Sequence, residues 1–154
     1  LLRRDPGRAV SADFQDLSAM IRQVYVCISG PASAPRDWAR FRELHHPRAL
    51  SLRTVVHSDG RIESRVFSVE EYIADVSPLF AVTPFHEIEI AQRIERFGQV
   101  AHVWSQYEAR AHPADAAILK RGANSIQAAH DGQRWWIVST IWDNERPGLR
   151  FDLF

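Results

Sequence analysis

Residues 85–111 read FHEIEIAQRIERFGQVAHVWSQYEARA, two long alternating stretches on either side of Gly98-Gln99. A two-residue loop that contains glycine is typical of a β-hairpin, because glycine readily adopts the left-handed backbone that such a turn needs. We therefore predict strands over about 85–97 and 100–111. This hairpin is the longest regular pattern in the chain and indicates its class of fold.

The register of this hairpin predicts which side chains share a face of the sheet. With Phe97 opposite Val100, apolar residues of both strands fall on one face: Ile88, Ile90, Ile94, Ala101, Val103, Tyr107 and Ala109. The other face collects mostly polar residues: Glu87, Glu89, Arg93, Glu95, His102, Trp104, Glu108 and Arg110. Because both strands agree, we expect the apolar face to be buried.

Two further hairpins complete the predicted sheet. Turns at Asp59-Gly60 and Asp131-Gly132 join four more strands, over about 50–57, 62–67, 117–130 and 133–143. Several of these strands exceed the usual five or six residues, so we expect a bent, bulged sheet. A bent sheet can enclose a cavity.

Three segments show helical rather than alternating periodicity. The first runs from Ser11, which can cap it, to a stop at Gly30-Pro31. Its apolar stripe is Phe14, Leu17, Ile21, Val24, Tyr25 and Ile28. The second covers about 37–46, and the third begins at the capping box Ser68-Val69-Glu70-Glu71 and ends before Pro84.

These elements predict an α+β fold in which three helices pack on a strongly curved, antiparallel or mixed sheet of about six strands. The helices and the sheet are expected to enclose a small apolar pocket. Residues 1–10 are interpreted as a loose arm, 11–143 as a single domain and 144–154 as a C-terminal tail.

Composition narrows the classes of partner. The 154 residues are 45% hydrophobic and 25% charged, with 19 acidic and 19 basic side chains, so no global field favours nucleic acid or an anionic membrane. No apolar run reaches the roughly 18 residues of a membrane span, and we expect a cytoplasmic protein. The single cysteine, Cys27, is interpreted as a buried small hydrophobe or, alternatively, a reactive thiol. No histidine pair has a recognised metal-ligand spacing, and no metal or cofactor is expected.

Polar residues on the apolar faces are the candidates for a site, because a buried polar group is costly without a partner or ligand. They are His86, Gln92, Ser105, Tyr107, Lys120, Asn124, Ser139 and Asp143. Tyr25, on the stripe of the first helix, is expected to point its hydroxyl at the same space.

His86 and Asp143 are the candidate acid/base groups, since a pocket imidazole or a desolvated carboxylate can titrate near neutrality. The alternative for His86 is a rim histidine or a satisfied core histidine, and that for Asp143 is a salt bridge to Lys120. Tyr107 and Tyr25 can donate a hydrogen bond to a ligand oxygen or simply fill the core.

The remaining candidates for ligand binding have similarly open interpretations. Gln92, Ser105, Asn124 and Ser139 can orient a ligand polar group or share a buried water. Arg53 can bind a ligand carboxylate or lie exposed at the surface.

The Asp131-Gly132 turn predicts that Ile126 pairs with Ile137 and that Ile141 is buried with them. The opposite face then carries large aromatic residues, which is unusual for a surface exposed to water. We interpret it as a homodimer interface formed by Trp104, Trp136, Val138 and Trp142.

The order of helix, tryptophan-containing helix, hairpin, helix and four long strands resembles the nuclear-transport-factor-2-like superfamily, which includes ketosteroid isomerases and SnoaL-like cyclases. The likeness covers residues 11–143. The segments that carry it are Arg36-Asp37-Trp38 to Phe41 and Leu44, Pro47-Arg48-Ala49-Leu50, and Asp131 to Ser139.

The resemblance implies a cystatin-like cone with a pocket but does not fix the function. Arg53 occupies the position at which ketosteroid isomerases carry their catalytic aspartate, so the isomerase base is absent. Our leading hypothesis is a dimeric, SnoaL-like domain that binds a small apolar molecule with a few polar groups. The alternatives are a cofactor-independent isomerase, dehydratase or cyclase using a pocket His or Asp with Tyr, and a non-catalytic interaction module.

Overall fold

The computed structural model describes residues 12–152, so the predicted arm of residues 1–10 lies outside the described part of the chain. Within residues 12–152 a 3-10 turn, Ala12–Phe14, precedes three helices: α1 (Leu17–Ile28), α2 (Trp38–Leu44) and α3 (Val69–Val82). The same residues contain six strands: β1 (His45–Val56), β2 (Ile62–Ser68), β3 (His86–Phe97), β4 (Val100–Arg110), β5 (Lys120–His130) and β6 (Trp135–Asn144).

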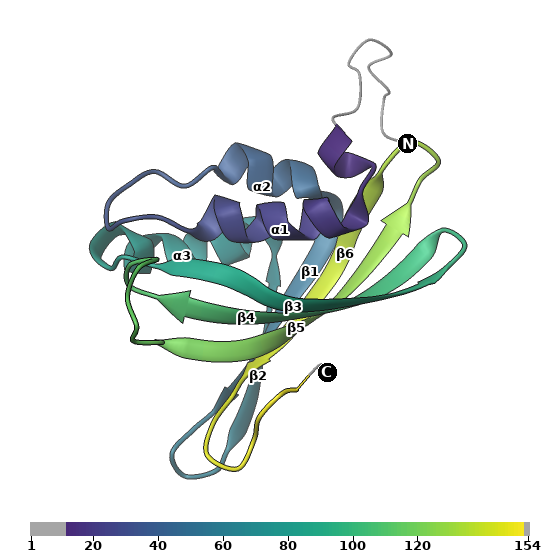
Figure 1. Ribbon diagram of the computed structural model, residues 1–154. Coiled ribbons are helices and arrows are strands. Elements are labelled where there is room, and N and C mark those ends of the chain that lie inside the picture. The colour runs from purple at the N-terminus through teal and green to yellow at the C-terminus, as the bar shows by residue number, and fades with distance from the viewer. Residues whose placement is uncertain (1–11, 153–154) are drawn as a thin grey trace.

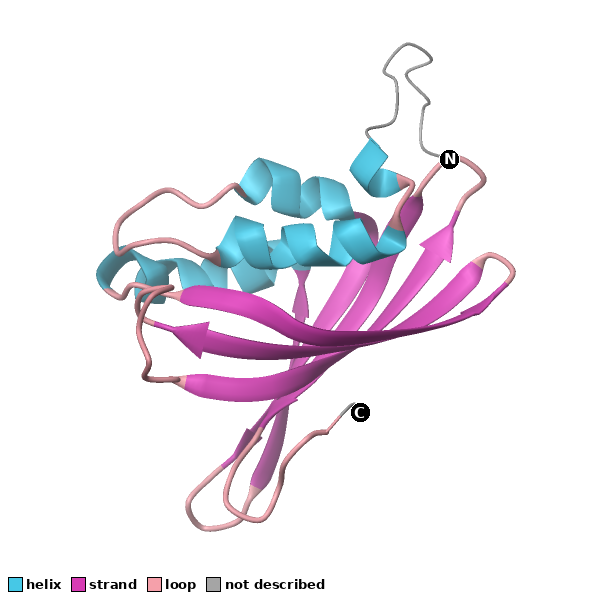
Figure 2. Ribbon diagram, viewed as in Figure 1, coloured by secondary structure: helices cyan, strands magenta, loops and turns pink. Residues whose placement is uncertain are grey.

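The strands form one mixed sheet with the order β2-β1-β6-β5-β4-β3. β1 runs parallel to β6, and the remaining neighbours are antiparallel. The three helices lie together on one face of the twisted sheet, as Figures 1 and 2 show. The predicted α+β class, with three helices on a mixed sheet, is therefore confirmed.

The helix ends follow their capping residues. Asp16 caps α1, with Oδ1 accepting from the Ser18 amide at 2.9 Å, so the helix begins later than the predicted start at Ser11, a residue outside the described part. The predicted capping box of α3 is present, because the Ser68 amide donates to Glu71 Oε2 at 2.7 Å and the Glu71 amide donates to Ser68 Oγ at 3.2 Å.

The core lies between α1 and the inner face of the sheet. Met20 and Ile21 of α1 are completely buried. Val103 of β4 and Ile137 of β6, which lie on the inner face of the sheet, are at most 1% exposed. Cys27 is 2% exposed, and burial raises the pKa of its thiol to about 11, as expected of a small hydrophobe.

Close to its turn, the β3–β4 hairpin has the predicted register. Phe97 pairs with Val100 and Ile94 with Val103, and Gly98 has φ +57°. Glycine is favoured there because a side chain with a Cβ is strained in the left-handed region. The two-residue turn is therefore as the sequence predicts.

A β-bulge at Ile90 changes the far half of β3. The register shifts between Glu89 and Ala91, after which Glu87, rather than Ile88, pairs with Ala109. A shift of one residue exchanges the two faces of a strand. The predicted inward placement of Ile88 and Ile90 is therefore wrong: they are 48% and 38% exposed, and Glu87 and Glu89 lie on the inner face.

The β5–β6 hairpin also differs from its prediction. Its turn has four residues, because His130 pairs with Trp135 and the Asp131 amide donates to the Arg134 carbonyl at 3.1 Å. The register shifts again between Gln127 and Ala128. The two-residue turn predicted at Asp131-Gly132 is therefore wrong.

The one-residue register shift between Gln127 and Ala128 decides which side chains of β6 reach the helices. Thr140 and Trp142 pair with the inward-facing Ser51 and Arg53 of β1 and lie on the inner face. Ile141, which the simple hairpin would bury, lies on the outer face and is 45% exposed.

Candidate functional site

A pocket lies between the helices and the inner face of the sheet, with a cavity volume of about 130 Å³. Its apolar walls come from all three helices and the sheet, and include Ile21, Ile28, Phe41, Val76, Phe80 and Phe85. Several aromatic rings pack together there; the Phe41 and Tyr72 centroids are 5.4 Å apart and those of Phe80 and Phe85 are 5.1 Å apart. A preformed apolar cavity of this kind suits a small organic ligand.

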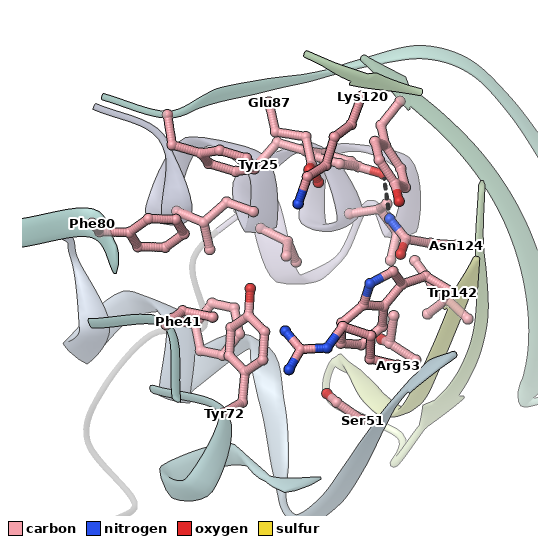
Figure 3. A pocket seen from close by; sticks show the side chains of 18 of the residues that line it. Tyr25, Phe41, Ser51, Arg53, Tyr72, Phe80, Glu87, Lys120, Asn124 and Trp142 are labelled. Atoms are coloured by element: carbon pink, nitrogen blue, oxygen red, sulfur yellow. Dashed lines mark hydrogen bonds between the residues drawn. The ribbon is translucent and has the colours of Figure 1, made fainter. Parts of the chain in front are cut away.

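Polar groups project into this cavity from opposite sides. Figure 3 shows Lys120 and Glu87 on one side of the pocket, and Arg53 and Tyr72 on the other, with their polar ends turned toward its middle. The lining is therefore apolar in its walls and polar at a few converging points, the usual arrangement for orienting a ligand.

Glu87 is the acidic residue of the lining. The Ile90 bulge turns it inward, and Ser29 at the end of α1 fixes its backbone: the Glu87 amide donates to Ser29 Oγ at 2.9 Å. Burial raises the pKa of the Glu87 carboxyl to about 8, against the opposing attraction of the Lys120 ammonium. At neutral pH this carboxyl is mainly protonated and can donate a hydrogen bond.

A chain of hydrogen bonds connects the pocket with the edge of the sheet. Asn124 Nδ2 donates to Tyr25 Oη at 2.9 Å, Tyr25 Oη and Ser105 Oγ are 2.6 Å apart, and Ser105 donates to Glu89. Because the Ser105 hydrogen is used for Glu89, Tyr25 must donate to Ser105. Burial also raises the pKa values of Tyr25 and Glu89.

The side chain of Tyr107 packs directly against the backbone of β5 at Gly122. Its hydroxyl donates to Asn144 Oδ1 at 2.9 Å, and a Cβ on Gly122 would lie 2.5 Å from the Tyr107 hydroxyl oxygen. Only glycine leaves room for the ring at this point. Burial is the main cause of the raised pKa of Tyr107, so it is a neutral phenol at neutral pH.

His45 lines the pocket where α2 meets β1. Its Nδ1 lies 2.7 Å from the Phe41 carbonyl oxygen, and burial lowers the pKa of the imidazole to about 4. Since a carbonyl only accepts, Nδ1 carries the hydrogen and Nε2 keeps its lone pair. His45 is therefore a neutral acceptor.

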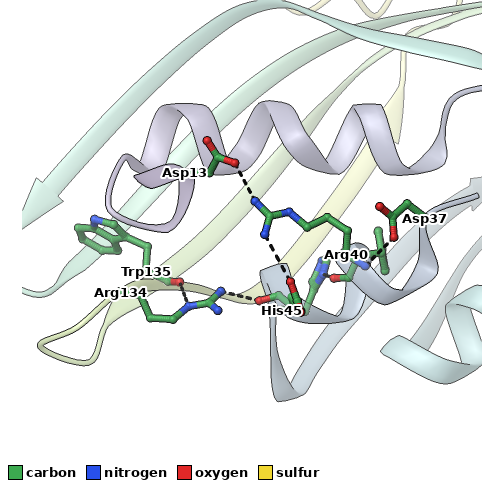
Figure 4. Close-up of polar contacts among 8 residues, drawn as sticks. Asp13, Asp37, Arg40, His45, Arg134 and Trp135 are labelled. Atoms are coloured by element: carbon green, nitrogen blue, oxygen red, sulfur yellow. Dashed lines mark hydrogen bonds and ion pairs between the residues drawn. The ribbon is translucent and has the colours of Figure 1, made fainter. Parts of the chain in front are cut away.

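Ionic contacts around α2 hold this corner together. Arg40 Nη2 lies 2.8 Å from Asp13 Oδ2, and Arg134 donates to the Glu43 carbonyl (Figure 4). The Arg134 guanidinium also lies 3.4 Å from the centroid of the Phe14 ring. These contacts connect the N-terminal 3-10 turn and the turn before β6 to the helix that precedes His45.

The structure brings together part of the set expected from the sequence. Tyr25, Arg53, Tyr107 and Asn124 line the pocket, as their predicted placement requires, and their roles stay predictions. Ser105 is fully buried behind Tyr25. Gln92 does not line the pocket; its Nε2 donates to Glu89 at 2.9 Å.

Both candidate acid/base residues lie elsewhere, so their predicted placement in the pocket is wrong. His86 follows the bulge onto the outer face, pairs with Arg110 and has its Nδ1 2.9 Å from the Ala111 carbonyl. Asp143 also faces outward, with Oδ1 2.9 Å from Arg146 Nη1, and it pairs with Ala123 rather than Lys120.

Two further placements on β6 are corrected by its register. Ser139 pairs with the exposed Leu50 on the outer face, not inside the pocket. Trp142, expected on the outer interface, lines the pocket and packs edge-on against Tyr72 with centroids 6.1 Å apart. Both errors have the same physical cause, the one-residue register shift between Gln127 and Ala128, which exchanges the two faces of β6 beyond it.

The other expected interface residues do not line the pocket. Val138 is 40% exposed, and Trp136 Nε1 donates to Asp131 Oδ2 at 2.9 Å. Trp104 packs on Phe151 of the C-terminal segment, with centroids 5.0 Å apart. That segment borders a second cavity, of about 220 Å³, on the outer face.

Sequence patterns missed several residues of the lining, namely His45, Tyr72, Glu87, Thr140 and Asn144. The signal for Tyr72 is its helical spacing from the apolar residues Val76 and Leu79 of α3. Glu87 has no comparable signal, because alternation alone assigns it to the polar face.

Residues 12–152 contain neither a membrane-spanning helix nor a metal-binding cluster. No helix in that range is long and apolar enough to cross a membrane. The same residues contain no group of three or more His, Cys, Asp or Glu side chains that could hold a metal ion.

Comparison with known proteins rests on structure rather than sequence. No protein-family model matches the chain, and no curated protein matches it. A protein of unknown function with a cystatin-like fold from Nostoc punctiforme PCC 73102 superposes with a TM-score of 0.59 and 11% identity, over 92% of this chain and 98% of that one.

Two other solved structures are similar. One is provisionally assigned as a calcium/calmodulin-dependent protein kinase type II association domain from Thiobacillus denitrificans ATCC 25259 (TM-score 0.62, 10% identity, 86% of this chain and 98% of that one). The other is an NTF2-like protein of unknown function from Pseudomonas putida KT2440 (TM-score 0.54, 10% identity, 76% and 75%). The chain therefore has the fold of the NTF2-like proteins.

Proposed function

We propose that the protein binds a small organic molecule with an apolar body and an oxygen-bearing head in the pocket between the helices and the sheet. The observation that carries the proposal is the lining itself, in which buried aromatic walls surround a few converging polar groups. Phe41 and Phe80 are 3% and 5% exposed, so they offer a dry surface to the body of the ligand.

A pair of substitutions on α3 tests this proposal. Leu79 lines the pocket and is 49% exposed, so Leu79→Trp narrows the pocket without disturbing the core. Val82→Trp adds a similar ring at a 77% exposed position that does not line the pocket. In a thermal-shift screen of small aromatic fragments, Leu79→Trp should lose the stabilisation that the parent and Val82→Trp retain. Equal stabilisation of all three proteins would refute the pocket as the binding site.

A second candidate function, proton transfer without a cofactor, is favoured by Glu87. A carboxyl whose pKa lies near 8 can give or take a proton at physiological pH, and the protonated form can donate to a developing oxyanion. Glu87 thereby takes the part that was expected of His86 or Asp143. The neutral phenols of Tyr25 and Tyr107 lie nearby.

Exchange of the α-hydrogens of small ketones with deuterated water tests the catalytic proposal. The parent protein should accelerate exchange of a ketone that binds the pocket, and Glu87→Gln should abolish the acceleration. Glu95→Gln, at an exposed position on the same strand, is the matched control and should keep it. Exchange at the uncatalysed rate would contradict a proton-transfer function while leaving binding intact.

We also propose that two copies associate through the outer face of the sheet. Apolar side chains exposed there are Leu50, Val56, Ile62, Val66, Val138 and Ile141, with exposed fractions from 39% to 70%. These side chains lie on three neighbouring strands, and a concentration of exposed apolar groups is typical of an interface. The likeness to a structure named as an association domain supports self-association.

Light scattering tests the dimer directly. Val66→Glu places a charge within this surface, on β2, whereas Val82→Glu places one on exposed α3. The parent and Val82→Glu should have the mass of a dimer and Val66→Glu that of a monomer. A monomeric parent protein would contradict the proposal.

A further inference from the structure

Lys120 is the only lysine in a chain that contains 19 basic residues, and it lies at the pocket. It begins β5, where its side chain is exposed at the mouth while its ammonium turns toward the cavity (Figure 3). Among residues 12–152, no carboxylate lies within ion-pair distance of it. The ammonium is therefore available to a ligand.

Arg53 approaches the same space from β1, on the opposite side of the pocket. Its Nη2 lies 3.1 Å from Asp75 Oδ2, which holds the guanidinium in place and balances its charge. A guanidinium has five N–H donors, so this single contact leaves others for a ligand. Tyr72 adds a phenol beside it.

The charge of Lys120 has no equivalent balance inside the pocket at neutral pH. Glu87 is the acidic residue of the lining that interacts with Lys120, but its buried carboxyl is mainly protonated at neutral pH. The phenols around it, Tyr25 from α1, Tyr72 from α3 and Tyr107 from β4, all have raised pKa values and carry no charge. With Arg53 offset by Asp75, the lining keeps a net charge of about +1.

We infer that the ligand is an organic monocarboxylate whose head lies between Lys120 and Arg53 and whose apolar body lies against Phe41 and Phe80. This inference rests on the proposed binding function and specifies its ligand class. The exposed Lys120 and the half-buried Arg53 place the head toward the mouth, and the buried rings place the body inside. A bidentate or paired cationic contact is the usual way in which proteins recognise a carboxylate.

The same geometry predicts how binding depends on pH. A carboxylate ligand is ionised throughout the range from pH 6 to 9. As the pH rises through about 8, Glu87 ionises, attracts Lys120 and repels the ligand. Affinity should therefore fall by up to about tenfold for each pH unit above that value.

Calorimetric titration with benzoate, 3-phenylpropanoate and 4-phenylbutanoate, each beside its uncharged amide, tests the inference. At pH 7 the best acid should bind at least tenfold more tightly than its amide. Lys120→Met should remove that preference. Arg121→Met removes the same charge one residue away on the outer face, so it should preserve the preference. Glu87→Gln should abolish the loss of affinity above pH 8.

Acetylation provides a second measurement that does not depend on the variants. Because Lys120 is the only lysine, peptide mass spectrometry reports its modification alone, and the best acid should slow it at least fivefold. Equal binding of acid and amide, without protection, would overturn the carboxylate inference and leave the binding function standing. No binding of either series would overturn both.

Discussion

Glu87→Gln should change the pH dependence of stability in a defined direction. The pKa of Glu87 is about 8 in the folded protein, against an ordinary value of 4.5 in an unfolded chain. Between these values the folded state holds a proton that the unfolded state has lost. Stability is therefore full below about pH 4.5 and falls as the pH rises through 8.

The size of this effect follows from the difference between the two pKa values. That difference corresponds to an upper limit of about 5 kcal/mol. Because the pocket opens to solvent, we expect about half of the limit, roughly 2–3 kcal/mol between pH 5 and pH 9. Glutamine is a neutral isostere, so the variant should lose this dependence.

Urea unfolding of the parent protein and of Glu87→Gln at pH 5, 7 and 9 measures the effect. The free energy of unfolding of the variant should rise relative to the parent as the pH increases. Glu95→Gln, exposed on the same strand, should track the parent at every pH. If the difference between the parent and Glu87→Gln stays constant from pH 5 to pH 9, burial of the Glu87 carboxyl is refuted.

Three further predictions concern the groups around the pocket. Gly122→Ala should destabilise the protein by about 1–3 kcal/mol in urea unfolding, since its Cβ would lie 2.4 Å from the Asp143 carbonyl oxygen; an unchanged midpoint would contradict the close packing. Tyr25→Phe should lower the free energy of unfolding by about 1–3 kcal/mol, because Asn124 and Ser105 both lose a buried hydrogen-bond partner. Tyr107→Phe should lower it by less than half as much, because the Tyr107 hydroxyl makes a single bond, to Asn144. The NMR titration of His45 should show a neutral imidazole down to about pH 4, so that stability is lost as the pH falls from 6.5 toward 4; a midpoint near 6.5 would show that the ring is solvated.

Much of the fold could be predicted from local chemistry. The capping box at Ser68 and the glycine turn at Gly98 depend on neighbouring residues only, and both are found where the pattern places them. The four-residue turn after His130 was not predicted, because Asp131-Gly132 alone also suits a two-residue turn.

The site was less predictable because β3 is fixed at both ends by different contacts. Gly98 sets the register at the turn, while at the other end Gly30 pairs with Phe85 and Ser29 binds the Glu87 backbone. The two registers differ by one residue, and the bulge at Ile90 takes up the difference. Hydrophobic alternation cannot show such a contact between a helix end and a distant strand.

Cross-strand NOEs from Ala109 test the Ile90 bulge most directly, because this bulge decides whether Glu87 or Ile88 faces the pocket. The structure predicts contacts from the Ala109 backbone to Glu87. Contacts to Ile88 instead would show a regular hairpin, which would return Glu87 to the outer face and remove the acid from the pocket.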